Sequence, residues 1–104
     1  MSPDKFVKHD ADKPRISLIP PESAIGLARV LTHGAKKYGA NNWCNGPDWS
    51  RYLDAAMRHT LEFQAGKDID ADSGLATADH VQACWAILSA LQKRGIGNDD
   101  RGTR

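Results

Sequence analysis

Acidic and histidine side chains that are able to bind a metal gather in the second half of the chain. His59 and Glu62 are three residues apart, and in a helix this spacing places both side chains on one face. Asp79 and His80 enter a strongly apolar segment, where a buried acid and a buried histidine need polar partners. Helical bundles build carboxylate metal sites from such inward-facing residues. Together with Asp72, these acids would suit Mg²⁺ or Mn²⁺, the hard ions that prefer oxygen ligands.

The same spacing is also typical of a ladder of ion pairs on a protein surface. Asp54, Arg58 and Glu62 recur at intervals of four residues. An exposed ladder of this kind contributes little to stability and binds no ligand. The pattern therefore leaves two interpretations of this helix open, one with metal ligands and one with solvated ion pairs.

The stretch DIDADSGLATAD, residues 68–79, is similar to a calcium loop of the EF-hand type. Asp68, Asp70 and Asp72 occupy the first, third and fifth positions of such a loop, and an aspartate closes it at the twelfth. The sixth position needs the conformational freedom of glycine, and here it is Ser73. A calcium-binding helical module is therefore the alternative to an enzyme. A helical oligomer without any ligand is a third hypothesis.

The segment HGAKKYGANNW, residues 33–43, combines groups that suit a nucleotide. Lys37 is able to neutralise phosphate, Trp43 to stack on a base, and the amide of Asn42 to hydrogen-bond a base edge. The same residues would equally suit a helix that ends in favourable lysines and is followed by a tryptophan packed over the core. This segment alone does not choose between the two.

Composition narrows the class of protein. The chain has 104 residues, which predicts one small domain, and 14 basic against 13 acidic residues give a net charge of +1. No basic face for a nucleic-acid polymer is expected from this balance. Cys44 and Cys84 form no CxxC pair, and no run approaches the ~18 apolar residues of a membrane helix. We expect a cytoplasmic protein with reduced cysteines and no membrane segment.

Hydrophobic periodicity predicts an all-α fold of about three main helices with an extended N-terminal arm. Helices are expected at 21–37, 49–65 and 74–94, the second capped by Asp48 and the third by Asp72 or Ser73. The arm covers residues 1–20, and residues 95–104 are expected to be a flexible tail. The segment 81–91 is apolar on nearly every side, so we expect a homo-oligomer to complete the bundle.

The motifs together resemble a known family. In order along residues 10–92 they are DKPR, GAKKYGANNW, WxxYLDAAMRH, AGKDIDADSG and a final DH. This order resembles the phage-associated branch of the MazG-like, all-α nucleoside triphosphate pyrophosphohydrolases, and within it the enzymes that act on dATP and dGTP. The resemblance implies a single MazG-like domain over 1–104, a homodimer or homotetramer, and Mg²⁺ or Mn²⁺ held by acids of two helices. It also implies cleavage between the α and β phosphates, release of pyrophosphate and control of the nucleotide pool, in the host cytoplasm if a phage encodes the chain.

Two departures from the family pattern bear on the ligands. The ExxE motif of the wider superfamily is replaced by His59-Thr-Leu-Glu62, and the ExxD motif by Ala76-Thr-Ala-Asp79, so each keeps one acid. Asp70 and Asp72 are then expected to supply missing oxygens.

The predicted roles follow from the residues and the resemblance together. Metal ligands are Glu62, Asp70, Asp72 and Asp79; the catalytic histidines His59 and His80 orient a ligand carboxylate; Lys37 and Arg58 bind phosphates; and Ile19, Asn42 and Trp43 contact the base or sugar. A hydroxide generated at the metal would attack the α phosphorus in line.

Overall fold

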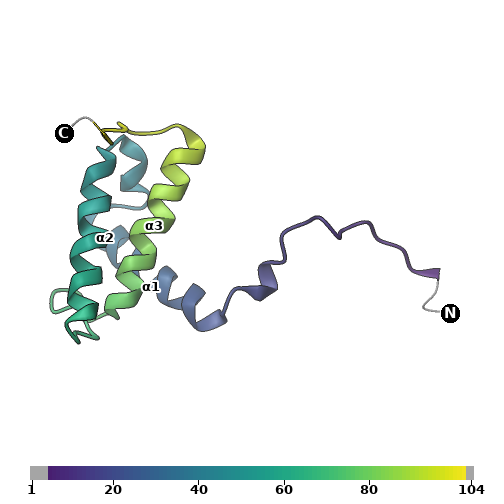
Figure 1. Cartoon of the computed structure of the whole chain (residues 1–104), viewed down its shortest axis with the longest axis horizontal. Helices are drawn as coiled ribbons and strands as arrows, with labels where there is room; N and C mark the ends of the chain where they lie inside the picture. Colours follow the sequence, from purple (N-terminus) through teal and green to yellow (C-terminus); the bar gives the residue numbers. More distant parts are fainter. Residues whose placement is uncertain (1–4, 103–104) are drawn as a thin grey trace.

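The computed structural model describes residues 5–102 and consists of three α-helices (Figure 1). These are α1 (Pro21–Tyr38), α2 (Trp49–Gln64) and α3 (Thr77–Arg94), with short 3₁₀ turns η2 (Ile16–Leu18) and η3 (Asn42–Asn45). No β-strand is present in the described part of the chain, so the all-α prediction is confirmed. Within the same residues, no helix has both the length and the apolar character needed to cross a membrane.

Helices α2 and α3 lie side by side and form the body of the molecule (Figure 1). The small Ala56 of α2 and Ala83 of α3 are both buried. Towards the end of α3, Leu88 and the fully buried Leu91 pack against Trp49 at the start of α2. Full burial of such a leucine contributes on the order of 2 kcal/mol of hydrophobic free energy.

The segment after α3 turns back over the start of α2. Gly95 ends the helix in the left-handed conformation, and the carbonyl oxygen of Asn98 then accepts a hydrogen bond from the Trp49 N–H at 3.0 Å. The Trp49 indole N–H donates to the carbonyl oxygen of Ile96 at 2.9 Å, and Asp100 accepts from the Ser50 N–H at 3.0 Å. These bonds satisfy free N–H groups at the N-terminus of α2. The segment 95–102 is therefore hydrogen-bonded to the start of α2. The expected flexibility of the tail stays a prediction, and residues 103–104 lie outside the described part.

The third helix begins three residues later than predicted, at Thr77 rather than Gly74. The loop before it closes on itself, because the Asp70 N–H donates to the carbonyl oxygen of Leu75 and the Thr77 N–H to that of Asp68. Gly74 makes the turn with a φ of +73°. The predicted caps, Asp72 or Ser73, were therefore wrong, since the residue preceding the helix is Ala76, which lacks a capping side chain. Asp48 does precede α2, but its carboxylate accepts a hydrogen bond from the Asn98 side chain.

Helix α1 packs on α3 through a glycine. Gly26 is buried, and a Cβ atom at this position would overlap the carboxylate of Asp79. That carboxylate accepts a hydrogen bond from Gln82, whose amide also donates to the carbonyl oxygen of Ser23 in α1 at 2.7 Å. The glycine and the amide together fix the position of α1 against α3.

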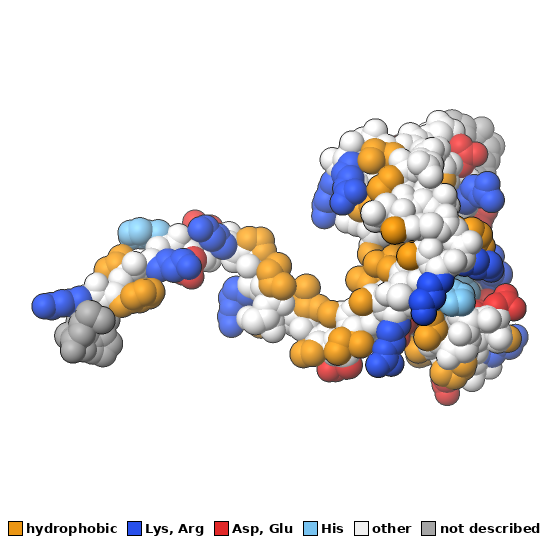
Figure 2. All heavy atoms as spheres, turned by 180° about the vertical axis from the view of Figure 1, so that it is seen from behind, with side chains coloured by type: hydrophobic (Ala, Val, Ile, Leu, Met, Phe, Trp, Pro, Cys, Tyr) orange, Lys and Arg blue, Asp and Glu red, His pale blue; other side chains and the backbone are white. Residues whose placement is uncertain are grey.

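The N-terminal arm runs away from the three helices (Figures 1 and 2). The radius of gyration is 17.8 Å, against about 13 Å for a compact chain of this size. The apolar residues of the arm, among them Ile16, Leu18 and Ile19, are exposed. The predicted extended arm is present; its first four residues lie outside the described part.

Candidate active site

A cavity of about 470 Å³ lies where the C-terminal half of α1, the helices α2 and α3 and the loop between them meet. Its volume is in the usual range for a small-molecule site. Its walls combine charged, imidazole, amide and aromatic side chains. These include Lys37, Tyr38, Asn42, Trp43, Tyr52, Arg58, His59, Asp70, Asp72, Ser73 and His80.

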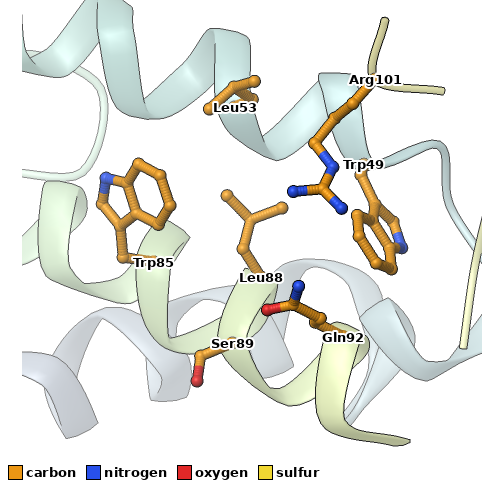
Figure 3. Close-up of a pocket in the computed structure, with 7 residues that line it drawn as sticks. All are labelled: Trp49, Leu53, Trp85, Leu88, Ser89, Gln92 and Arg101. Atoms are coloured by element: carbon orange, nitrogen blue, oxygen red, sulfur yellow. The ribbon is translucent and has the colours of Figure 1, made fainter. Parts of the chain in front are cut away.

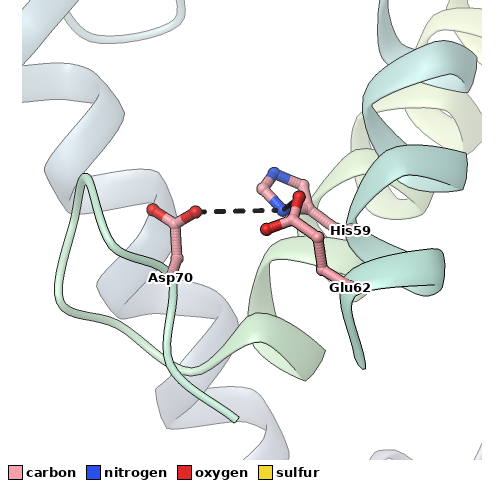
Figure 4. Close-up of side chains that lie close together, drawn as sticks. All are labelled: His59, Glu62 and Asp70. Carbon is pink, nitrogen blue, oxygen red and sulfur yellow. Dashed lines mark ion pairs between the residues drawn. The ribbon is translucent and has the colours of Figure 1, made fainter. Parts of the chain in front are cut away.

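Three side chains at this cavity form a compact group of possible metal ligands (Figure 4). Helix α2 supplies His59 and, one turn later, Glu62, while Asp70 comes from the α2–α3 loop and faces them. One ligand atom of each lies within 4.8 Å of the others. His59 Nδ1 is 3.5 Å from Glu62 Oε1 and 4.0 Å from Asp70 Oδ1. These distances exceed a hydrogen bond and leave room for a shared ion.

The donor atoms fit a divalent cation. His59 is only 9% exposed, and its Nδ1 atom is buried without a hydrogen-bond partner. A buried nitrogen of this kind costs free energy unless a hydrogen-bond partner or a bound ion satisfies it. Two carboxylates supply hard oxygens and the imidazole supplies a nitrogen, and divalent cations accept both kinds of ligand.

Asp70 is held in its charged form. Burial would by itself raise the pKa of this carboxyl, but hydrogen bonds from the N–H and hydroxyl of Ser73, and the neighbouring His80 and His59, outweigh it. The net effect lowers the pKa of Asp70 below its ordinary value. The Ser73 N–H donates to Asp70 Oδ2 at 2.9 Å. An ionised carboxylate with one oxygen fixed in this way is suited to bind a cation.

His80 links the loop to α3. Its ring stacks on His59 with 4.8 Å between the ring centroids, and its Nε2 atom lies 2.6 Å from Ser73 Oγ. Burial lowers the pKa of His80, and Asp70 only partly offsets this. The net effect is a pKa of His80 below its ordinary value, which favours the neutral form of this half-buried ring.

The wall formed by the end of α1 and by η3 carries the groups predicted to bind a nucleotide. Lys37 lies in the last turn of α1, and its ammonium is 5.3 Å from the centroid of the Tyr38 ring. Trp43 lines the cavity, and the Arg94 guanidinium lies 5.1 Å from the centroid of its ring. Asn42 is exposed and accepts a hydrogen bond from Asn45. An aromatic ring beside cations is an arrangement able to receive a base and phosphates.

The structure brings most of the predicted site residues together but separates two from them. Lys37, Asn42, Trp43, Arg58, His59, Asp70, Asp72 and His80 line one cavity, and Glu62 joins it through the metal-ligand group. Asp79 instead contacts Gln82 and Gly26 at the α1–α3 interface. Ile19 lies on the arm, half exposed and outside the residues that line the cavity.

Three residues of the cavity were missed by the sequence analysis as site residues. Ser73 was considered only as a helix cap or loop residue, and its contact with His80 depends on how the loop folds. Tyr52 faces the cavity from α2, and burial raises the pKa of its hydroxyl. His33 lies one turn before Lys37 on α1, a helical spacing that could have identified it.

The calcium-loop alternative finds no support in the geometry. Asp70 faces His59 and Glu62, Asp79 faces α1, and Asp68 is exposed. Within residues 5–102, no three carboxylates of this loop have ligand atoms within 4.8 Å of one another. An EF-hand loop requires its acids to converge on one ion.

Comparison with known proteins identifies the family. The family described as dATP/dGTP diphosphohydrolase, N-terminal, matches residues 3–101. A protein of Salmonella phage PMBT28 named dATP/dGTP diphosphohydrolase is 38% identical over 95 residues, which is 91% of this chain and 32% of the relative. The chain thus spans about a third of the length of this relative. No solved structure matches it significantly. The resemblance found in the sequence motifs is confirmed: the chain belongs to the dATP/dGTP diphosphohydrolase N-terminal domain family.

Proposed function

We propose that this chain hydrolyses dATP and dGTP to the monophosphate and pyrophosphate in a reaction that requires Mg²⁺ or Mn²⁺. The observation that carries the proposal is one cavity that combines a metal-ligand group with cationic and aromatic side chains. The name of the phage relative supports the choice of substrate. Such an activity would control the purine deoxynucleotide pool of a host cytoplasm.

Glu62, Asp70 and His59 are the residues proposed to hold the metal. Asp70 and His59 are each 9% exposed, so little water competes for their ligand atoms, while Glu62 is more accessible. Asp72 lines the same cavity from its exposed rim and is placed to meet a second ion that arrives with the triphosphate. A bound divalent ion supplies neutralisation of phosphate charge and acidification of water.

The triphosphate is proposed to lie against Lys37 and Arg58. The guanidinium of Arg58 is 3.9 Å from Glu62 and its side chain is 64% exposed, so this ion pair holds it weakly. Arg58 is therefore able to turn towards phosphate oxygens when substrate enters. Lys37 approaches the same cavity from α1, so cations from two helices would neutralise the leaving pyrophosphate.

The base is proposed to stack on Trp43, with Asn42 hydrogen-bonding its edge. Arg94 lies over the Trp43 ring and restricts its motion, so the ring is positioned before substrate binds. The arm residue Ile19 would close over the base only if the arm folds towards the cavity.

The reaction itself needs one water and one in-line displacement. The water oxygen attacks the α phosphorus, the bond from that phosphorus to the α–β bridging oxygen breaks, and pyrophosphate leaves. His59 and His80 are proposed to keep the carboxylates of Glu62 and Asp70 in place during this step. His59 Nδ1 lies 3.5 Å from Glu62 Oε1, and His80 Nε2 lies 3.7 Å from Asp70 Oδ2.

A second copy of the chain is proposed to cover the face of α2 and α3 that points away from this cavity. Helix α2 turns Tyr52 and His59 towards the cavity, whereas Met57 and Leu61 line a separate apolar hollow of about 360 Å³ with Trp85 of α3. These three side chains are 54–64% exposed. The apolar surface continues past Leu53 and Leu88 into a smaller pocket of about 190 Å³ (Figure 3). Exposed apolar side chains that gather on one face are typical of an interface, which supports a homodimer or homotetramer.

Pyrophosphate release from dATP and dGTP, measured with Mg²⁺, with Mn²⁺ and with EDTA, tests the activity. We expect release with either metal, none with EDTA, and a strong reduction in an Asp70→Asn variant that circular dichroism shows to be folded. dCTP and dTTP serve as substrate controls. Absence of pyrophosphate with all four nucleotides and both metals would refute the proposal.

A further inference from the structure

Ser73 connects three parts of the metal-ligand region through one short side chain. Its N–H donates to Asp70 Oδ2 at 2.9 Å, and its hydroxyl oxygen lies 2.6 Å from His80 Nε2. The same oxygen accepts a hydrogen bond from the Leu75 N–H at 3.1 Å. The loop that carries Asp70 is thereby connected to the first turn of α3.

The two carboxylate oxygens of Asp70 have different neighbours. Oδ2 is occupied by Ser73 and lies 3.7 Å from His80 Nε2. Oδ1 faces His59 Nδ1 at 4.0 Å, on the side of the metal-ligand group. A carboxylate held by one oxygen presents the other in a fixed direction, so less conformational freedom is lost when an ion binds.

The hydroxyl also sets the position of His80, whose ring lies against His59 at 4.8 Å between centroids. His59 is the member of the metal-ligand group with the unsatisfied buried nitrogen. Movement of Ser73 would therefore disturb two of the three proposed ligands at once, Asp70 directly and His59 through the stacked ring.

We propose that Ser73 is a positioning residue whose N–H holds Asp70 and whose hydroxyl holds His80 in the arrangement that binds the metal. This inference rests on the proposed function, because it presupposes an ion at His59, Glu62 and Asp70. Ser73 itself is not a ligand: it is absent from the group of convergent donors, and its oxygen is already engaged by Leu75 and His80.

The test is Mn²⁺ affinity in the absence of nucleotide, measured by electron paramagnetic resonance of free Mn²⁺ and by calorimetry. Loss of a group that orients a ligand typically costs 10–100-fold in metal affinity. Ser73→Ala removes the hydroxyl but keeps the N–H bond to Asp70, so we expect about a tenfold loss, at the low end of that range. Ser73→Thr keeps the hydroxyl and should restore affinity to within about threefold of the wild type, less than the loss in Ser73→Ala.

A matched control is Ser17→Ala, which removes the same hydroxyl group from an exposed residue of the arm and should leave Mn²⁺ affinity unchanged. His80→Phe is a second variant in case Ser73→Ala folds poorly. It keeps an aromatic ring beside His59 and removes the nitrogen that contacts Ser73, so it should also weaken Mn²⁺ binding.

Wild-type affinity in Ser73→Ala, or a Ser73→Thr variant as weak as Ser73→Ala, would overturn this inference alone. Wild-type protein that binds no Mn²⁺ and releases no pyrophosphate would overturn the proposed function and this inference with it. Pyrophosphate release by the wild type together with unaltered Mn²⁺ binding in both Ser73→Ala and His80→Phe would leave the function intact and remove the role of Ser73.

Discussion

Replacing Gly26 by alanine should loosen the attachment of α1 to the rest of the molecule. The new methyl group would overlap the Asp79 carboxylate, and that carboxylate is held by Gln82, which is hydrogen-bonded to Ser23. Asp79 therefore has to move or α1 has to shift outwards. Because α1 carries one wall of the candidate active site, the consequence extends from stability to substrate binding.

Two opposing terms set the size of the effect. Alanine in a helix interior is favoured over glycine by about 0.5–1 kcal/mol, while forcing a methyl group into a filled contact typically costs about 1–3 kcal/mol. Because the added Cβ would overlap three atoms of Asp79, the cost lies in the upper half of its range, and the net destabilisation of Gly26→Ala is roughly 1–2 kcal/mol. Gly34 in the same helix has no atom within 4 Å of an added Cβ, so Gly34→Ala should show the favourable term alone.

Urea and thermal unfolding followed by circular dichroism, at one fixed protein concentration, measure both variants. We expect the melting temperature to fall by about 4–15 °C for Gly26→Ala and to rise by a few degrees for Gly34→Ala. Combining Gly26→Ala with Asp79→Ala should recover part of the loss, because the overlapping carboxylate is gone. Equal stability of the two single variants would refute the assignment of Gly26 and Asp79 to the α1–α3 contact.

Three further predictions concern the site and the surface. Asp70→Asn should abolish detectable Mn²⁺ binding measured by calorimetry. Asp79→Asn preserves the size of the side chain and should keep the Mn²⁺ affinity within about threefold of the wild type, a change far below the 10–100-fold cost of disturbing a metal ligand. Loss of Mn²⁺ binding in Asp79→Asn but not in Asp70→Asn would restore Asp79 as a ligand. The metal-free protein should lose stability as the pH falls below about 6.5, because the lowered pKa of His80 means that the unfolded chain binds the proton first. The lowered pKa of Asp70 adds a further loss of stability below about pH 4. Melting temperatures between pH 7 and pH 3 measure both declines, and His80→Phe should remove the first and reduce the second, because His80 contributes to the lowered pKa of Asp70. Leu61→Asp, on the exposed face of α2, should convert the proposed oligomer into a monomer, measured as molar mass by light scattering. An oligomeric wild type and a Leu61→Asp variant of the same molar mass would exclude this interface.

The helices and the family were predictable from the sequence because both depend on local order along the chain. Apolar residues at helical spacing located α1 and α2 to within one residue at each end. The start of α3 was not predictable in this way. The predicted cap Ser73 instead hydrogen-bonds Asp70 and His80, and the helix begins only at Thr77, behind Ala76.

The two aspartates that were predicted as equivalent ligands show why the site could be predicted only in part. Asp79 and His80 are consecutive in a helix, so their side chains point about 100° apart. Helical spacing does not say which neighbouring element each side chain faces. His80 turns to the loop and His59, whereas Asp79 turns to Gly26, the position in α1 where the absence of a side chain makes room for it. Helix α1 contains two glycines, Gly26 and Gly34, and a neighbouring side chain fills the space only at Gly26, so the sequence alone did not single this position out. The acid that lies beside His59 and Glu62 is instead Asp70, whose position depends on a loop closed by hydrogen bonds that no periodicity encodes.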